Sequence, residues 1–163
     1  MQSEAFNTKI APLRSDEAQQ VADLISATIS SLSYYNDRAK AEEIAKYGTR
    51  ELTEYSNADP DSVLVAYCNN RPVGFCISKY DDGLIWLSWF GVHKDYRHRG
   101  IGEILIRTLA GSLDRRRAHK IWCDTRTDNI QSQRLLRKMG FVKIAQLLNH
   151  WYGQDFFLWE WQP

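Results

Sequence analysis

The sequence predicts a mixed α/β domain in which a central mixed β-sheet of about seven strands is flanked by helices on both faces. Two observations predict this class. Apolar residues recur at helical spacing in several segments, and short runs rich in β-branched and aromatic residues lie between them. In chain order these segments read β-α-α-β-β-β-α-β-α-β-β, and a length of 163 residues suits one domain, 1–163, with a full core.

The first part of the chain predicts one strand and two helices. Residues 8–13 are a short strand, and residues 14–32 are a helix that begins at Ser15 or Asp16. That helix has an apolar stripe made of Val21, Leu24, Ile25, Thr28, Ile29 and Leu32. A second helix over about 36–55 is expected, although the Tyr-Gly-Thr sequence at 47–49 interrupts its pattern.

The middle of the chain predicts an antiparallel meander of three strands, separated by the turn sequences Asn-Asn-Arg-Pro and Asp-Asp-Gly; its segments are 62–68, 72–80 and 84–92. Helical spacing then resumes from Ile101 to Leu113. The remaining segments are a strand at 120–125, a helix at 129–140 closed by Gly140, and strands at 141–148 and 156–161.

Composition excludes several classes of protein. The chain is 44% hydrophobic and 25% charged, as in ordinary globular proteins, and no apolar run approaches the ~20 residues that cross a bilayer. The N-terminus lacks the basic and apolar regions of an export signal, so we expect a cytoplasmic protein without membrane partners. Cys68, Cys76 and Cys123 are isolated from one another and from paired histidines, which predicts free thiols and no metal.

Charge is distributed unevenly along the chain. The net charge is +1, but residues 94–143 contain thirteen lysines and arginines against five acidic residues. This asymmetry is compatible with a site for a polyanion, whereas we expect Arg115 to Arg117 to form a solvated helix end. The basic segment has few interleaved aromatic residues, and the rest of the chain is acidic, so we expect no nucleic-acid partner.

Two glycines one residue apart mark the junction between a strand and a helix, in the sequence Tyr-Arg-His-Arg-Gly-Ile-Gly at 96–102. The first N–H groups of a helix have no intrahelical partner, so a phosphate can accept their hydrogen bonds where no Cβ blocks it, as at Gly100 and Gly102. Arg97 and Arg99 would add charged contacts. A tight turn is the alternative, and the third glycine of a dinucleotide fold and the Gly-Lys-Ser/Thr of a P-loop are both absent.

The spacing Arg97-x-x-Gly100-x-Gly102, followed by Asn129 and by Leu-Leu-Arg-Lys-Met-Gly-Phe at 135–141, resembles the GNAT superfamily of coenzyme-A-dependent N-acetyltransferases. The motifs cover about residues 84–141, and the order of elements agrees over the whole chain. The resemblance implies a sheet that splays between its fourth and fifth strands. It also implies acetyl-CoA as cosubstrate, without a metal.

The same resemblance implies where the cosubstrate would bind. The backbone of Phe90 and Val92 would bind the pantetheine arm as an added strand. The pyrophosphate would lie on the amides of Arg97, His98, Arg99, Gly100, Ile101 and Gly102. Asn129 would contact the pantetheine or the acetyl group, and it is also a plain N-cap candidate.

The chain departs from the superfamily at the usual acid and base. Leu136 stands where many members have a tyrosine acid, and Trp86 stands where many have a glutamate base. Tyr152 and His150, between the last two strands, are the substitutes we expect as acid and base. An aromatic residue covering the sheet end and an exposed turn histidine are their respective alternatives.

These features predict an acetyl-CoA-dependent N-acetyltransferase in which a neutral primary amine attacks the thioester directly. The acceptor is expected to be a small-molecule amine or a peptide N-terminus. The alternative is a catalytically weak coenzyme-A-binding module that acts as a sensor or partner subunit. A homodimer is also expected, formed through residues 156–161 as an apolar edge strand.

Overall fold

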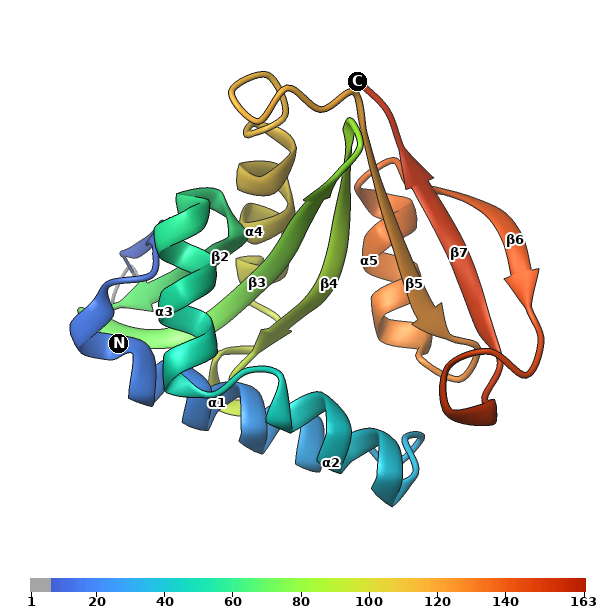
Figure 1. Cartoon of the computed structure of the whole chain (residues 1–163), viewed down its shortest axis with the longest axis horizontal. Helices are drawn as coiled ribbons and strands as arrows, with labels where there is room; N and C mark the ends of the chain where they lie inside the picture. The colour runs from blue at the N-terminus through green and yellow to red at the C-terminus, as the bar shows by residue number, and fades with distance from the viewer. Residues whose placement is uncertain (1–6) are drawn as a thin grey trace, which may run out of the picture.

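The structure, a computed structural model, describes residues 7–163 and contains one seven-stranded sheet in the order β1-β2-β3-β4-β5-β7-β6 (Figure 1). Most of the N-terminal segment used for the localisation prediction therefore lies outside the described residues. The strands are β1 (Thr8–Pro12), β2 (Val63–Cys68), β3 (Arg71–Asp81), β4 (Leu84–Val92), β5 (Lys120–Arg126), β6 (Val142–Leu147) and β7 (Phe156–Trp161). The mixed sheet and its strands confirm the predicted fold class.

Helices cover both faces of this sheet (Figure 1). They are α1 (Ala18–Ser30), which follows a 3-10 turn at Ser15–Glu17, α2 (Asp37–Ala45), α3 (Thr49–Ala58), α4 (Ile101–Ala110) and α5 (Ile130–Lys138). The single helix expected over 36–55 is two helices. The backbone becomes extended at Gly48, the N-cap of α3, where ψ is 170°, and this separates α2 from α3. The described helices include none that is long and apolar enough to cross a membrane.

Each face of the sheet has its own apolar core. Val21, Ile25 and Ile29 of α1 pack against the β2 and β3 side chains of one face, including Phe75. On the other face, Leu105 is fully buried in a cluster that β4 and β5 share with α4. Burial of each large aliphatic side chain contributes about 1.5–3 kcal/mol, so the two cores hold the first four strands rigidly.

The sheet splits between β4 and β5, as predicted. The two strands are parallel, and they pair only from Leu84 to Leu87, against 120–123. Beyond this point they diverge, as Figure 1 shows. In β4 the split begins at a bulge, because Leu87 pairs with Ser78 and Trp89 with Ile77, which leaves Ser88 unpaired. The later part of β4 therefore lies beside an opening in the sheet.

The prediction that residues 156–161 form an edge strand, through which two copies would pair, is wrong. Strand β7 is not an edge strand, because it pairs with β5 on one side and β6 on the other. Its backbone hydrogen-bonding groups are thus used within the chain, and the edges of the sheet are β1 and β6. Nothing in this arrangement allows 156–161 to pair with a second copy.

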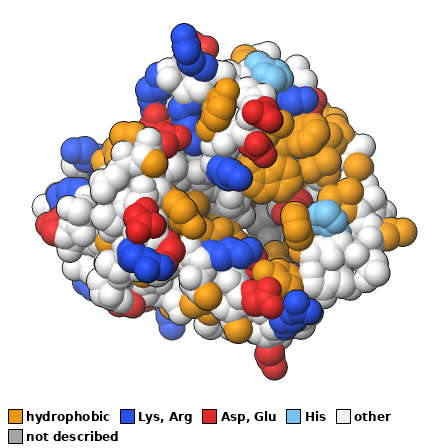
Figure 2. Space-filling view, in the orientation of Figure 1, with side chains coloured by type: hydrophobic (Ala, Val, Ile, Leu, Met, Phe, Trp, Pro, Cys, Tyr) orange, Lys and Arg blue, Asp and Glu red, His pale blue; other side chains and the backbone are white. Residues whose placement is uncertain are grey.

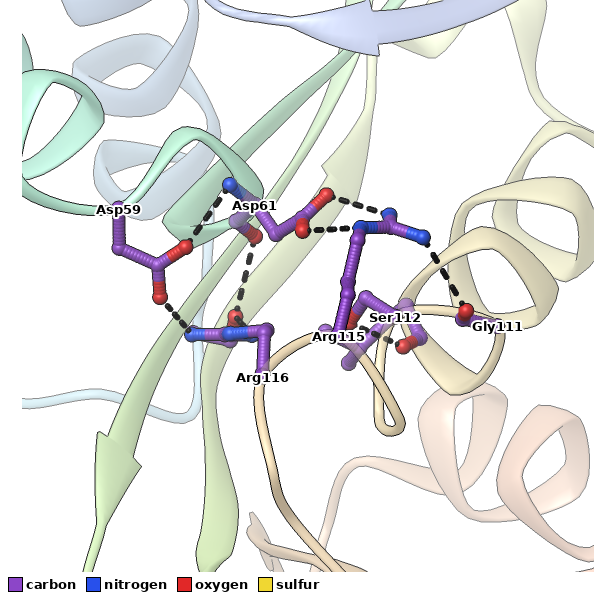
Figure 3. Close-up of polar contacts among 8 residues, drawn as sticks. Asp59, Asp61, Gly111, Ser112, Arg115 and Arg116 are labelled. Carbon is purple, nitrogen blue, oxygen red and sulfur yellow. Dashed lines mark hydrogen bonds and ion pairs between the residues drawn. The ribbon is translucent and has the colours of Figure 1, made fainter.

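The basic segment after α4 is tied to the acidic turn before β2 (Figure 3). Arg115 donates to both carboxylate oxygens of Asp61, at 2.5 and 2.6 Å. Arg116 is buried, lies 2.7 Å from Asp59 and donates to the Ser78 hydroxyl at 2.7 Å. These two arginines are therefore structural, and they are neither a free polyanion site nor merely a solvated helix end.

Candidate functional site

A cleft of about 710 Å³ opens where β4 and β5 part. Its walls come from both halves of the sheet, from the connector between α1 and α2, from the start of α5, and from the connector between β6 and β7. Figure 2 shows this face of the molecule hollowed near its centre, with hydrophobic side chains around the hollow. The cleft is thus a consequence of the split in the sheet.

The structure brings together six of the eleven predicted site residues. The residues that line the cleft are Phe90, Val92, Arg97, Gly102, Asn129 and Tyr152. Four of the others, His98 to Ile101, belong to the turn at the start of α4 without lining the cleft. The remaining one, His150, is exposed, and its ring centroid lies 4.4 Å from that of Trp151.

The unpaired part of β4 offers backbone groups to the cleft. Phe90 and Val92 pair with Cys76 and Gly74 of β3 on one side, and β5 has already turned away on the other. An edge of this kind can bind an extended ligand as an additional strand. The geometry required of Phe90 and Val92 is therefore present.

The turn before α4 has the conformation that its glycine permits. Gly100, the N-cap, has a φ of 77°, and it supplies no side-chain hydrogen bond to the helix. A Cβ built on Gly100 would meet nothing within 4 Å, so the space beside the turn is open. An anion can thus approach the first N–H groups of α4.

The second glycine has an additional role that the sequence did not reveal. A Cβ built on Gly102 would lie 3.0 Å from Cδ2 of Leu135. The glycine therefore allows α4 and α5 to approach each other closely, besides any role toward phosphate. Arg97 donates from Nε to the Val92 carbonyl at 3.0 Å, which fastens the turn to the end of β4.

Asn129 is the N-cap of α5. Its Oδ1 accepts from the Ser132 N–H at 3.1 Å, and its Nδ2 donates to the Ser132 hydroxyl at 2.9 Å. The capping role is confirmed, while contact with a cosubstrate stays a prediction.

Asp124 is a cleft residue that sequence reasoning missed. It follows Cys123, the last β5 residue to pair with β4, and its Oδ2 accepts from the indole Nε1 of Trp151 at 2.6 Å. Burial raises the pKa of Asp124, and the hydrogen bond from Trp151 and the proximity of His150 oppose part of that rise. In the sequence Asp124 is distinguished only as the one acidic residue of 120–126, which does not indicate a role.

Glu43 of α2 is a second missed residue, and it joins three side chains in the cleft wall. It accepts from Lys46 Nζ at 2.6 Å, from Tyr152 Oη at 2.8 Å and from Trp89 Nε1 at 2.9 Å. The surrounding sequence, Ala-Glu-Glu-Ile-Ala-Lys, is that of an ordinary exposed helix, and it gave no signal of this role.

Tyr152 lies in the cleft in a left-handed conformation with a φ of 56°. Its carbonyl accepts from Asn36 Nδ2 at 3.3 Å, which ties the two connectors together. Burial and the hydrogen bond to Glu43 raise the pKa of Tyr152, so the phenol keeps its proton at neutral pH.

The two positions at which the chain departs from the superfamily have different surroundings. Trp86 lines the cleft, whereas Leu136 is fully buried in the core behind it. Cys123 also lines the cleft, but burial raises the pKa of its thiol well above the ordinary value. Among residues 7–163 no group of three potential metal ligands comes together.

Comparison with known proteins identifies the class. Residues 29–141 match the acetyltransferase (GNAT) family, and the chain belongs to that family. The chain is 41% identical over 73 residues to an acetyltransferase of Pectobacterium atrosepticum, a match that covers 45% of this chain and 52% of that protein. The chain thus spans about half the length of this relative.

Two further similarities extend over more of the chain. N-alpha-acetyltransferase 30 of Dictyostelium discoideum is 23% identical over 130 residues, a match that covers 72% of this chain and 70% of that protein. The crystal structure of PaiA N-acetyltransferase from Thermoplasma acidophilum, in complex with coenzyme A, superimposes with a TM-score of 0.81 at 18% identity. That superposition covers 96% of this chain and 99% of the other, and it shows a shared fold.

Proposed function

We propose that the chain transfers the acetyl group of acetyl-CoA to a primary amine by direct attack of the amine on the thioester. The observation that carries the proposal is the juxtaposition, at the split in the sheet, of the unpaired part of β4 with Asp124. The unpaired part of β4 provides a binding edge for the extended arm of the cosubstrate, and Asp124 provides a proton acceptor beside it.

The residues present suit acetyl-CoA. The open space at Gly100 and the first N–H groups of α4 would receive the pyrophosphate, and the edge at Phe90 and Val92 would receive the pantetheine. When bound, acetyl-CoA supplies an activated acyl group. The neighbour from Thermoplasma acidophilum, which holds coenzyme A, supports this assignment through the shared fold.

Asp124 takes the role of base in this proposal. A primary amine arrives as an ammonium ion, and its nitrogen attacks only after it has lost a proton. The Asp124 carboxylate accepts that proton and releases it to solvent, and the nitrogen bonds to the thioester carbonyl carbon. As the carbon–sulfur bond breaks to release a thiolate, the nitrogen loses its second proton to Asp124, which leaves a neutral amide. His150 was the expected base, but it is exposed and does not line the cleft.

Tyr152 remains the proposed acid that protonates the departing thiolate. Its raised pKa keeps the hydroxyl protonated, and the bond to Glu43 must open for the proton to be delivered. Positioning of amine and thioester supplies a further share of the rate, up to about 7–11 kcal/mol in favourable systems. An acetylated Cys123 is not part of the route, because its buried thiol stays protonated.

The competing function is a module that binds coenzyme A without catalysis, favoured by the loss of the usual acid and base at Leu136 and Trp86. Purified protein is mixed with acetyl-CoA and a panel of primary amines, and free thiol is followed over time. Amine-dependent thiol release supports the enzyme. Tight binding of acetyl-CoA by calorimetry without thiol release for any amine supports the module.

A further inference from the structure

Only one carboxylate at the described surface of the cleft lacks a cationic partner. Glu43 is paired with Lys46 at 2.6 Å, and Asp128 is paired with Arg126 at 3.3 Å. Asp124 accepts from the neutral indole N–H of Trp151 and from its own backbone N–H. No ion pair within 4.0 Å among residues 7–163 includes its carboxylate, and His150 acts on it only from a greater distance. The cleft therefore offers a place for one positive charge.

Aromatic rings line the same cleft as this carboxylate. The rings that line the cleft belong to Tyr34, Tyr35, Tyr47, Trp86, Trp89, Phe90, Trp151, Tyr152 and Phe156. The Tyr35 ring lies between the two walls: its centroid is 5.5 Å from that of Trp89 on β4 and 6.3 Å from that of Phe156 on β7. Such rings attract an ammonium ion through their faces, and they pack favourably against another flat ring.

A second ammonium group has no corresponding place. The Glu43 carboxylate already accepts from Lys46, Trp89 and Tyr152. A diamine or polyamine reaching Glu43 would have to displace these donors and would meet the positive charge of Lys46. The cleft is thus suited to a monoamine.

An extended peptide has few free backbone partners at this end of the cleft. The carbonyl of Tyr34 accepts from Gln154 Nε2 at 3.1 Å and from Arg126 Nε at 3.2 Å. The carbonyl of Asp155 accepts from Arg126 Nη1 at 2.5 Å, and that of Tyr152 accepts from Asn36. The two connectors therefore bond to each other, whereas recognition of a peptide along its backbone requires open donors and acceptors.

Resting on the proposed acetyl transfer, we infer that the acceptor is a small arylalkyl monoamine, with its ammonium group against Asp124 and its ring among the aromatic side chains of the cleft. This acceptor satisfies the one unpaired carboxylate and the aromatic walls together. It also needs no contact with the backbone of the two connectors.

The test compares acceptors that differ in one feature at a time. Acetyl-CoA-dependent thiol release is measured with phenethylamine, with ethylamine, which keeps the ammonium and lacks the ring, with spermidine, and with a tetrapeptide that has a free N-terminus. We expect kcat/KM for phenethylamine to exceed that of each of the other three by about tenfold or more. A higher value for ethylamine, spermidine or the peptide overturns the inference and leaves the proposed acetyl transfer intact.

A binding measurement separates this inference from the proposed reaction. Phenethylamine is titrated into the protein in the presence of coenzyme A, with tryptophan fluorescence as the signal, because Trp86, Trp89 and Trp151 line the cleft. We expect saturable binding that weakens about tenfold or more in Asp124→Asn and is unchanged in Asp114→Asn, an exposed carboxylate elsewhere. Absence of binding in the parent protein overturns the inference even if another amine is acetylated, and failure to bind acetyl-CoA overturns the proposed function.

Discussion

At the scale of single residues, the cleft depends on side chains whose importance comes from their surroundings. Asp124 is one acidic residue in a strand, and it becomes distinctive because β4 leaves β5 one residue earlier. Glu43 becomes distinctive because Trp89 and Tyr152, far away in sequence, both donate to it. Local sequence could predict neither role, since both arise from contacts between distant segments.

Replacing Asp124 by asparagine should reduce turnover by about 10²–10⁴ while acetyl-CoA affinity is retained, because the amide cannot accept the proton of the amine. The amide oxygen can still accept from Trp151, so we expect the melting temperature at pH 7 to be no lower than that of the parent. Thiol-release assays measure turnover, and calorimetry measures acetyl-CoA affinity. Equal turnover in Asp124→Asn and Asp114→Asn would remove Asp124 from the mechanism.

The pH profile provides a separate check on Asp124. Its pKa is raised, and its ionised form is the one that accepts a proton, so kcat should increase as pH rises through that raised pKa. Loss of this limb of the profile is expected in Asp124→Asn. A limb that persists unchanged in the variant must belong to another group.

Removing the hydroxyl of Tyr152 tests the proposed acid. In Tyr152→Phe the ring remains, so acetyl-CoA affinity should be unchanged while turnover falls by about 10²–10⁴. Tyr80→Phe, which removes a hydroxyl from a half-exposed tyrosine on β3, is the matched control. If the turnover rates of the two variants are equal, the Tyr152 hydroxyl serves only to donate its hydrogen bond to Glu43.

At the scale of elements, periodicity and turn residues predicted most of the fold. The meander of β2, β3 and β4, the two later helices and the glycine turn follow from local pattern. Strand order does not, because it depends on which distant strands pair. The 156–161 segment, which is apolar at all positions except Glu160, was expected at an edge, and it instead inserts between β5 and β6.

The proposed phosphate site at the turn before α4 can be tested by comparing Gly100 with another glycine that also has a positive φ. Gly100 and Gly83 have φ values of 77° and 91°, so alanine at either should cost about 1–2 kcal/mol of folding free energy. Only Gly100→Ala adds a methyl group beside the start of α4, and it alone should weaken acetyl-CoA binding, by about tenfold or more. Calorimetry showing equal affinity in both variants would contradict the phosphate site.

At the scale of the whole molecule, buried polar contacts join segments that the sheet leaves apart. Arg116 connects the loop after α4 to Asp59, before β2 (Figure 3). It also donates to Ser78 on β3. The sequence showed only a run of three arginines, and it could not indicate which of them is buried. Arg116, Asp59 and Ser78 do not line the cleft, so the effect of this contact should be on stability.

Arg116→Ala should lower the free energy of unfolding by about 1–3 kcal/mol, because it removes the buried hydrogen bond to Ser78 and leaves the partly exposed Asp59 without its cationic partner. Arg117→Ala, at an exposed position, should change it by less than about 0.5 kcal/mol. Denaturant titration measures both, and acetyl-CoA affinity should be the same in the two folded variants. Equal unfolding midpoints would show that the buried contact contributes nothing.

The central claim is that this fold transfers acetyl directly from acetyl-CoA to an amine. The most direct measurement is a single-turnover reaction with acetyl-CoA and excess phenethylamine, in which acetylated amine, free thiol and the intact mass of the protein are followed together. We predict that acetylated amine and thiol appear in equal amounts at the same rate and that the protein mass never changes. An acetyl group on the protein before product forms, or acetyl-CoA that stays bound and unconsumed, would contradict the account.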